Sequence, residues 1–333
     1  MTLFSRQEQK AAPLPNEGHL PGFDGATGWL NSPPLTNEAL RGKVVLVDFW
    51  TYTCINWLRT LAYVRAWSDK YADGLVVVGV HTPEFPFERD VDNVRWSAAN
   101  MDVRYPIALD SSYSVWNAFS NSYWPAVYIA DAEGRIRHHH FGEGGYEECE
   151  RVVQQLLRDA GGDTIDDLVT VSPEGFEVQA DWTNLSTSET YLGYDQAQNF
   201  GSPGGAKLEQ ARTYDAPESL RLNEWALAGD WTVGRRAAVS DPAGGKIVFR
   251  FQARDVHLVM GPRAGSASVP FRVSLDGQAP GVAHGLDVDA DGGGTVERQR
   301  LYQLIRQHGS TAESTIEVAF PAGGVEAYCF TFG

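Results

Sequence analysis

Cysteine is scarce in this chain of 333 residues, which contains only Cys54, Cys149 and Cys329. The three lie far apart in the sequence, and an odd number of thiols cannot all pair within one chain. A disulfide scaffold is therefore excluded, and so is a zinc site built from paired C-x-x-C motifs. This count leaves room for one reactive thiol and two bystanders.

Long apolar runs and an excess of positive charge are also missing. The longest apolar runs, such as residues 75–80, are far shorter than the roughly 20 residues that a membrane helix needs. The first residues lack the apolar stretch of a secretory signal, so we expect a soluble, cytoplasmic protein without membrane insertion. Lys and Arg number 27 against 43 Asp and Glu, a net charge of −16, which disfavours binding to nucleic acid.

The length and the 43% content of hydrophobic residues favour two globular domains. In the first half, apolar runs of strand length alternate with segments of helical periodicity, and this alternation predicts an α/β sheet with helices on both faces. We expect strands at 43–50, 74–81, 105–110, 125–130 and 135–141, and helices at 54–71, 88–101, 112–119 and 146–157.

The pattern changes after residue 162. Short alternating runs separated by Gly, Pro and Asp turns predict an all-β, jelly-roll-like sandwich, with a helix expected only at 301–307. The expected strands lie at 225–229, 246–252, 256–260, 271–275, 315–320 and 326–332. The predicted organisation is an N-terminal arm (1–20), an α/β domain (21–162), a linker (163–186) and a β-sandwich domain (187–333).

Cys54 stands where a buried strand, a short polar turn and a helix meet. The N-terminus of a helix carries partial positive charge and free N–H donors, which stabilise a thiolate relative to a thiol. This position predicts a reactive cysteine, and the alternative is an inert buried one.

The frame Asp48-Phe-Trp-x-x-x-Cys54 resembles the active-site frame of the thioredoxin superfamily, and residues 28–157 are similar to its redoxin/TlpA-like branch. More of the chain resembles the soluble C-terminal region of DipZ-type thiol-disulfide proteins, which couples a thioredoxin-like domain to a carbohydrate-binding-module-like sandwich. The stretches that carry this resemblance are WLNSPPLTNEALRGKVVLVDFWTYTCIN, GVHTPEFPFE, YWPAVYIAD, FGEGGYEE and the terminal CFTFG.

The resemblance implies roles for several residues. Cys54 matches the nucleophilic cysteine, and Asp48 matches the buried carboxylate that takes and returns protons. Pro125 matches the cis-proline that faces the active site and positions the substrate, with Trp124 before it. Trp50 and Asn56 are the other expected neighbours of the thiol.

The chain departs from this family at Trp57, where a second cysteine would complete C-x-x-C. An indole cannot attack a mixed disulfide, so three outcomes remain open. Cys54 acts alone, in monothiol exchange or in peroxide reduction with Thr51 orienting the peroxide, as Thr51-x-x-Cys54 is similar to the Thr-x-x-Cys of peroxiredoxins. Cys149 resolves the intermediate from a distance, although three neighbouring glutamates would raise its pKa. Alternatively, the domain is redox-inactive.

The leading interpretation is a thiol-dependent oxidoreductase that needs no cofactor or metal, acts on a thiol or peroxide substrate and uses a soluble thiol reductant. The alternative is a redox-inactive scaffold whose sandwich recognises a glycan or a protein. Five aromatic residues of that domain form either a sugar-stacking platform or part of its core: Tyr191, Tyr194, Trp225, Trp231 and Tyr302.

Other polar motifs carry weaker signals. His138 and His140 share a strand face, but without a third ligand an exposed strand is the better interpretation of this His-His-His run. His81 and Glu84 either border the thiol site or shape a loop. Residues 287–292 match half of a calcium loop, yet Arg298 stands where its last ligand belongs, so we expect an acidic turn.

Overall fold

The computed structural model describes residues 13–163, 165–263, 268–309 and 311–333. The chain divides into two compact units, Met1–Ser172 and Pro173–Gly333, and the division falls within the segment expected as a linker. Among the described residues, none of the helices combines the length and the apolar character that crossing a membrane requires.

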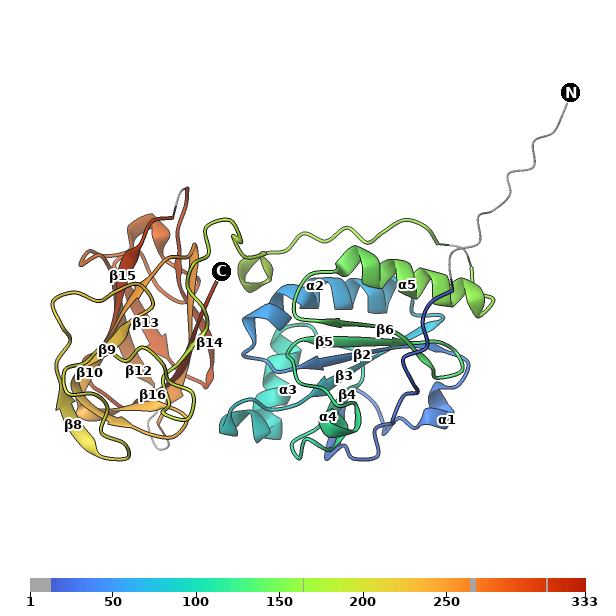
Figure 1. The fold of residues 1–333 in the computed structure, drawn as a ribbon, viewed down its shortest axis with the longest axis horizontal. Coiled ribbons are helices and arrows are strands. Elements are labelled where there is room, and N and C mark those ends of the chain that lie inside the picture. The colour runs from blue at the N-terminus through green and yellow to red at the C-terminus, as the bar shows by residue number, and fades with distance from the viewer. Residues whose placement is uncertain (1–12, 164, 264–267, 310) are drawn as a thin grey trace, which may run out of the picture. The chain divides into compact units, whose positions relative to one another are not determined.

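The first unit is an α/β domain built on one six-stranded sheet, as the alternating pattern predicts (Figure 1). The strand order is β1-β4-β3-β2-β5-β6, with β2, β3 and β4 parallel and the other pairings antiparallel. The elements are β1 (Gly28–Leu30), α1 (Asn37–Leu40), β2 (Val44–Trp50), α2 (Ile55–Lys70), β3 (Leu75–His81), a 3-10 turn η1 (Pro86–Arg89), α3 (Val91–Asn100), β4 (Ile107–Leu109), α4 (Ser114–Ala118), β5 (Ala126–Ala130), β6 (Ile136–Phe141) and α5 (Tyr146–Asp159).

Strand β2 is buried along its whole length because both faces of the sheet are covered. Phe49 points to one face, where its ring contacts Trp116 of α4 and Phe119. Since successive side chains of a strand alternate, Asp48 and Trp50 point to the other face, toward α2. This alternation places a carboxyl group beneath the helix that follows Cys54.

Helices α2 and α5 pack together over one face of the sheet (Figure 1). The rings of Tyr63 and Tyr146 stack with centroids 3.8 Å apart. The buried carboxylate of Glu150 accepts hydrogen bonds from Trp67 Nε1 and from the Tyr71 hydroxyl. These contacts fix the axis of α2, and with it the position of its first turn.

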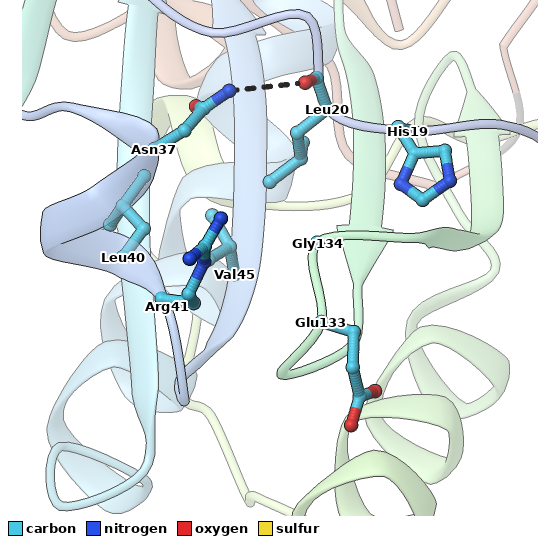
Figure 2. A pocket seen from close by; sticks show the side chains of 8 residues that line it. All are labelled: His19, Leu20, Asn37, Leu40, Arg41, Val45, Glu133 and Gly134. Atoms are coloured by element: carbon cyan, nitrogen blue, oxygen red, sulfur yellow. Dashed lines mark hydrogen bonds between the residues drawn. The ribbon is translucent and has the colours of Figure 1, made fainter.

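The arm expected at residues 1–20 lies partly outside the described residues, but its last residues are part of the α/β domain. The Glu17 N–H donates to the Ile136 carbonyl, and the Asn37 side chain donates to the Leu20 carbonyl over 3.3 Å. Leu20 therefore lies buried beside α1, next to a small pocket that Figure 2 shows with Val45 in its lining. This pocket lies where β2 begins, whereas Cys54 follows the other end of the strand.

The second unit is all-β, as expected, and its strands form a continuous curled antiparallel sheet consistent with a sandwich. The strands are β7 (Thr190–Tyr191), β8 (Ala211–Tyr214), β9 (Trp225–Val233), β10 (Ala238–Phe251), β11 (Asp255–Pro262), β12 (Val269–Leu275), β13 (Gly293–Val296), β14 (Arg300–Arg306), β15 (Ser314–Phe320) and β16 (Val325–Phe332); short 3-10 turns lie at η2 (Gly175–Glu177) and η3 (Gly281–Ala283).

The helix expected at 301–307 is wrong, because this segment is strand β14 and pairs with β11. Its five central residues are all buried, so both faces of the strand are covered. A strand buried on both faces loses the alternation of polar and apolar residues that distinguishes it from a helix.

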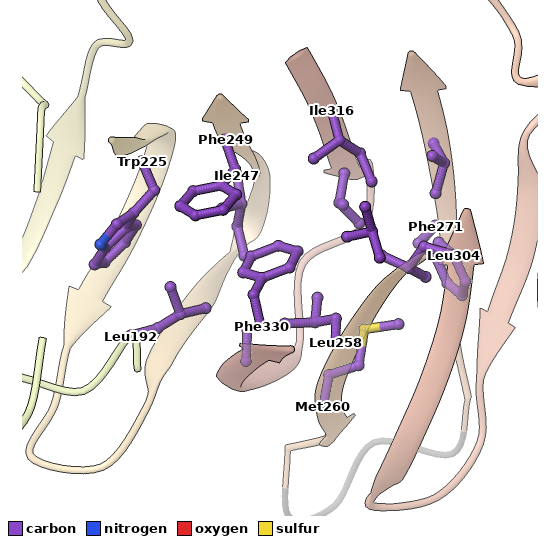
Figure 3. Packing of buried hydrophobic residues seen from close by; sticks show 14 of the residues in the cluster. Leu192, Trp225, Ile247, Phe249, Leu258, Met260, Phe271, Leu304, Ile316 and Phe330 are labelled. Carbon is purple, nitrogen blue, oxygen red and sulfur yellow. The ribbon is translucent and has the colours of Figure 1, made fainter. Parts of the chain in front are cut away.

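The core of the sandwich is rich in aromatic rings (Figure 3). Phe249 and Phe330 stack with centroids 5.3 Å apart at its centre. Trp225, Trp231 and Tyr302 are each at most 1% exposed, so these three belong to the core and not to a sugar-stacking platform.

Candidate active site around Cys54

Cys54 lies at the junction that the sequence indicates. Strand β2 ends at Trp50, residues 51–53 form a turn, and Cys54 is the N-cap of α2. Its N–H donates to the Thr51 carbonyl over 3.2 Å, and its carbonyl accepts from the Leu58 N–H over 3.0 Å. The residue is only partly buried, in contrast to Cys149 and Cys329.

The Trp124–Pro125 segment faces the thiol. The Cys54 Sγ lies 3.9 Å from the Trp124 carbonyl oxygen, and the peptide bond between Trp124 and Pro125 is cis. Pro125 immediately precedes β5, whose first residue, Ala126, pairs with Phe49 of β2. The pairing of β2 with β5 thus brings together residues that lie 70 positions apart in the chain.

Asp48 is fully buried beneath the start of α2. Its Oδ2 accepts a hydrogen bond of 2.9 Å from Trp57 Nε1 and a longer one of 3.5 Å from the Tyr105 hydroxyl. Burial raises the pKa of Asp48 to about 7, because the charged form loses its hydration, and the two hydrogen bonds only partly oppose this. The carboxyl group can therefore exchange a proton near neutral pH.

Trp57 fills the place of the missing second cysteine. Its indole is fully buried and stacks on Trp50 with ring centroids 4.3 Å apart and planes inclined by 23°. Asp48 thus contacts an indole N–H where a thiol would stand in a C-x-x-C protein. The role of Asp48 as a proton relay stays a prediction.

His81 borders the same cluster from the end of β3. Its ring lies edge-on to the Trp50 ring, with centroids 4.8 Å apart, and stacks on the Tyr52 ring, with centroids 5.8 Å apart. Burial lowers the pKa of His81 to about 3, since the imidazolium would be stripped of water. His81 is therefore a neutral aromatic partner of the site at physiological pH.

Two contributors to the site were missed from the sequence. Tyr105 reaches Asp48 from the segment before β4, and Gly79 of β3 leaves it room, because a Cβ on Gly79 would lie 2.9 Å from the Tyr105 ring. Glu88 was expected at the start of a helix, but Asp90 caps α3, and Glu88 lies in η1. The Asp90 N-cap signal was present in the sequence and would have placed Glu88 outside the helix.

Thr51 and Asn56, the remaining predicted site residues, flank Cys54 on either side. Thr51 is fully buried. Burial raises the pKa of Glu88, and the Thr51 hydroxyl is among the groups that lower it. Asn56 lies half-buried in the first turn of α2, where its carbonyl accepts from the Thr60 hydroxyl. Neither arrangement tests a role in orienting substrate.

The other two cysteines are buried. Burial, with a smaller contribution from Glu148, raises the pKa of Cys149 to about 12, so burial and not the three glutamates is the main cause. Cys149 Sγ lies 3.6 Å from His138 Nε2, on the α5 side of β6. Cys329 is 1% exposed on β16, as expected for a small core residue.

The weaker motifs have local partners. His139 Nδ1 lies 2.7 Å from Glu17 Oε2. The Asp287 carboxylate lies 2.6 Å from Arg300 Nη2 and accepts the Gln303 N–H, so the first aspartate of this acidic turn is already paired within the protein. No group of three or more metal-binding side chains occurs among the described residues.

Comparison with known proteins places this chain in a family. Residues 187–333 match the family described as thioredoxin like C-terminal domain. The thiol-disulfide oxidoreductase YkuV of Bacillus subtilis is 33% identical over 138 residues, which cover 41% of this chain and 93% of YkuV. The chain belongs to the thioredoxin-like family.

Similarity to another relative extends along nearly the whole chain. The protein DipZ of Mycobacterium tuberculosis, like that of Mycobacterium bovis, is 39% identical over 97% of this chain. The chain spans only 44% of the length of these relatives. A solution structure of a thioredoxin-like protein in the oxidised form is 34% identical, covers 43% of this chain and 96% of its own, and has a TM-score of 0.40.

Proposed function

We propose that this protein is a thiol-disulfide oxidoreductase in which Cys54 is the sole nucleophile. The observation that carries the proposal is the contrast among the three thiols. Cys54 is partly exposed at the N-terminus of α2 beside the Trp124 carbonyl, whereas Cys149 and Cys329 are buried. The start of the helix favours the thiolate form that attacks disulfides.

The reaction requires two external sulfur partners. The Cys54 thiolate attacks one sulfur of a substrate disulfide, R–S–S–R′, which forms Cys54–S–S–R and releases R′–S⁻. Because Trp57 offers no thiol, a soluble thiolate, R″–S⁻, then attacks the R sulfur and releases Cys54 as the thiolate together with R–S–S–R″. Overall, R″–S⁻ supplies the two electrons that R′–S⁻ carries away, so the disulfide R–S–S–R′ is exchanged for the disulfide R–S–S–R″.

Disulfide exchange is favoured over peroxide reduction. Thr51, the residue expected to orient a peroxide, is fully buried and lies in the environment of Glu88. The relative YkuV is named a thiol-disulfide oxidoreductase, which agrees with this choice. Asp48 is the proposed proton acceptor and donor, since its pKa of about 7 suits exchange near neutral pH.

The test compares the wild-type chain with Cys54→Ser and Cys149→Ser. The substrate is a mixed disulfide between glutathione and a model peptide, with free glutathione as reductant. Before free glutathione is added, we expect the wild type and Cys149→Ser to carry one glutathione by mass spectrometry and Cys54→Ser to carry none. After it is added, the first two should release the peptide thiol faster than the uncatalysed reaction, and Cys54→Ser only at the uncatalysed rate. Retained turnover in Cys54→Ser, or none in the wild type, would overturn the proposal; the second result would favour a redox-inactive binding protein.

A further inference from the structure

Glu88 is a fully buried carboxylate next to the turn that presents Cys54. Its Oε1 accepts a hydrogen bond of 2.6 Å from the Thr53 hydroxyl. Its Oε2 accepts the backbone N–H groups of Glu84 and Phe85 over 2.7 and 2.8 Å. One side chain therefore joins the turn before α2 to the segment between β3 and α3.

The turn at residues 51–53 is held on one side by Tyr52, whose ring stacks on His81 with centroids 5.8 Å apart. It belongs to neither β2 nor α2, and its side chains point inward, with Thr53 only 1% exposed. The Cys54 N–H holds the Thr51 carbonyl from within the turn, but that bond does not attach the turn to the rest of the domain. The bond from Thr53 to Glu88 attaches the turn to the segment between β3 and α3, one residue before the thiol.

The buried charge of Glu88 is unfavourable for a residue with a purely structural role. Every hydrogen bond that Glu88 accepts within the described part of the chain comes from a neutral donor, and no ion pair offsets its charge there. Burying a carboxylate without a cation costs free energy, and burial accordingly raises the pKa of Glu88. Such groups concentrate at functional sites, where their geometry serves the chemistry.

We propose that Glu88, acting through Thr53, is a positioning residue that holds Cys54 at the N-terminus of α2 and against the Trp124 carbonyl. This inference rests on the proposed function of Cys54. Loss of the anchor lets the turn move, so the thiol leaves the free N–H groups of the helix and the docking position beside Trp124. Small displacements of a reacting group are enough to slow a reaction by an order of magnitude or more.

The experiment uses the full chain and the variants Thr53→Val, Thr53→Ser and Glu88→Gln. Valine matches threonine in shape but lacks the hydroxyl, serine keeps the hydroxyl, and glutamine cannot accept from both Thr53 and the two N–H groups. Three quantities are measured for each: the free energy of unfolding, the rate of Cys54 alkylation by iodoacetamide from pH 5 to 9, and the rate of exchange with the glutathione mixed disulfide. Cys54→Ser supplies the alkylation background.

We expect Thr53→Val and Glu88→Gln to move the alkylation midpoint to higher pH and to slow exchange about tenfold at pH 7. Thr53→Ser should behave as the wild type, and the double variant Thr53→Val/Glu88→Gln should be no worse than Glu88→Gln alone, because that change already disrupts the Thr53 contact.

Two results would overturn this role. If the variants lose stability while the midpoint and the rate of the folded protein are unchanged, Glu88 is only structural. If Glu88→Gln moves the midpoint to lower pH, Glu88 acts as a repelling charge and does not position the thiol. Failure of the proposed function is recognised separately, because wild-type Cys54 would then be alkylated without exchanging disulfides.

Discussion

The indole N–H of Trp57 donates a 2.9 Å hydrogen bond to the buried carboxyl group of Asp48. The position that a resolving cysteine would occupy is thus filled by a side chain that donates to one oxygen of this buried acid and also stacks on Trp50. The substitution therefore keeps the framework of a dithiol site, with a nucleophile, a buried acid and a facing proline, but removes its second thiol.

The first prediction concerns Trp57→Cys. Residues three apart on a helix bring their Cα atoms to about 5.5 Å, the usual span of a disulfide. We expect the introduced thiol to form a disulfide with Cys54 that dithiothreitol reverses, and the variant, once reduced with dithiothreitol and freed of it, to reduce a stoichiometric amount of insulin without added monothiol. Non-reducing peptide mapping and insulin turbidity measure the two effects.

The matched control for this change is Trp57→Ala. Removing a buried tryptophan costs roughly 3–5 kcal/mol of stability in either variant, so both are compared at a temperature where circular dichroism shows them folded. Trp57→Ala should show neither the disulfide nor insulin reduction. A folded Trp57→Cys that stays a free dithiol under oxidising conditions would contradict the prediction.

The second prediction concerns Asp48 and pH. Its pKa is about 7 in the folded state against a usual 3.8, so folding is most favoured while the group is protonated. As the pH rises from about 4 to 7, the unfolded chain releases this proton more readily, and wild-type stability falls by about 4 kcal/mol through this group.

Asp48→Asn removes that dependence with little change of shape. We expect the variant and the wild type to be similar near pH 4, and the variant to become progressively more stable relative to the wild type up to pH 8. Urea unfolding at each pH measures the difference. A difference that stays constant across this range would show that Asp48 titrates normally in the folded protein.

The sequence indicated much of this site, because its signals are local. A buried run ending at Trp50, a turn and a helical period starting beside Cys54 are enough to predict the strand, the turn and the helix. The resemblance to the thioredoxin active-site frame was enough to mark Trp57 as the position of a missing thiol. Its hydrogen bond to Asp48 and its stack on Trp50 could not be predicted, since both depend on how α2 lies over β2.

The residues that were missed depend on contacts between distant segments. Tyr105 contacts Asp48 from the segment before β4, and Glu88 contacts Thr53 from η1. No sequence spacing predicts either contact. In the second domain, β14 was mistaken for a helix because its burial on both faces leaves no period of two. A periodic pattern of polar and apolar residues arises only where one face of an element is exposed to water. An element buried on all sides has no such pattern.

The third prediction concerns His81, whose pKa is about 3 in the folded state against a usual 6.5. Folding is then favoured above pH 6.5, where both states are neutral. Below that pH the unfolded chain takes up a proton that the folded chain refuses, so stability falls by about 5 kcal/mol through this group by pH 3.

His81→Phe keeps an aromatic ring against Trp50 and Tyr52 but cannot be protonated. The variant should lose less stability than the wild type between pH 6.5 and pH 3, as followed by urea unfolding. His139→Phe serves as the control, because His139 is exposed and pairs with Glu17 at the surface. Equal acid sensitivity of His81→Phe and the wild type would exclude this account.

The fourth prediction concerns a buried ion pair that attaches α2 to the loop after β6. Arg59 and Glu143 lie 2.8 Å apart, with side chains 1% and 7% exposed. Arg59→Met leaves the carboxylate buried without its cation and should destabilise the protein by roughly 3–5 kcal/mol. Because burial raises the pKa of Glu143 and Arg59 opposes this, the loss should shrink as the pH falls and Glu143 takes up a proton.

Two further variants separate this effect from the loss of packing. Arg59→Met/Glu143→Gln removes the uncompensated charge and should recover much of the stability at pH 7, as urea unfolding would show. Arg95→Met makes the same substitution in the exposed pair of Arg95 and Asp92, and should change stability by no more than about 1 kcal/mol. If the double variant is as unstable as Arg59→Met at every pH, the arginine contributes through its packing in α2 and not through its charge.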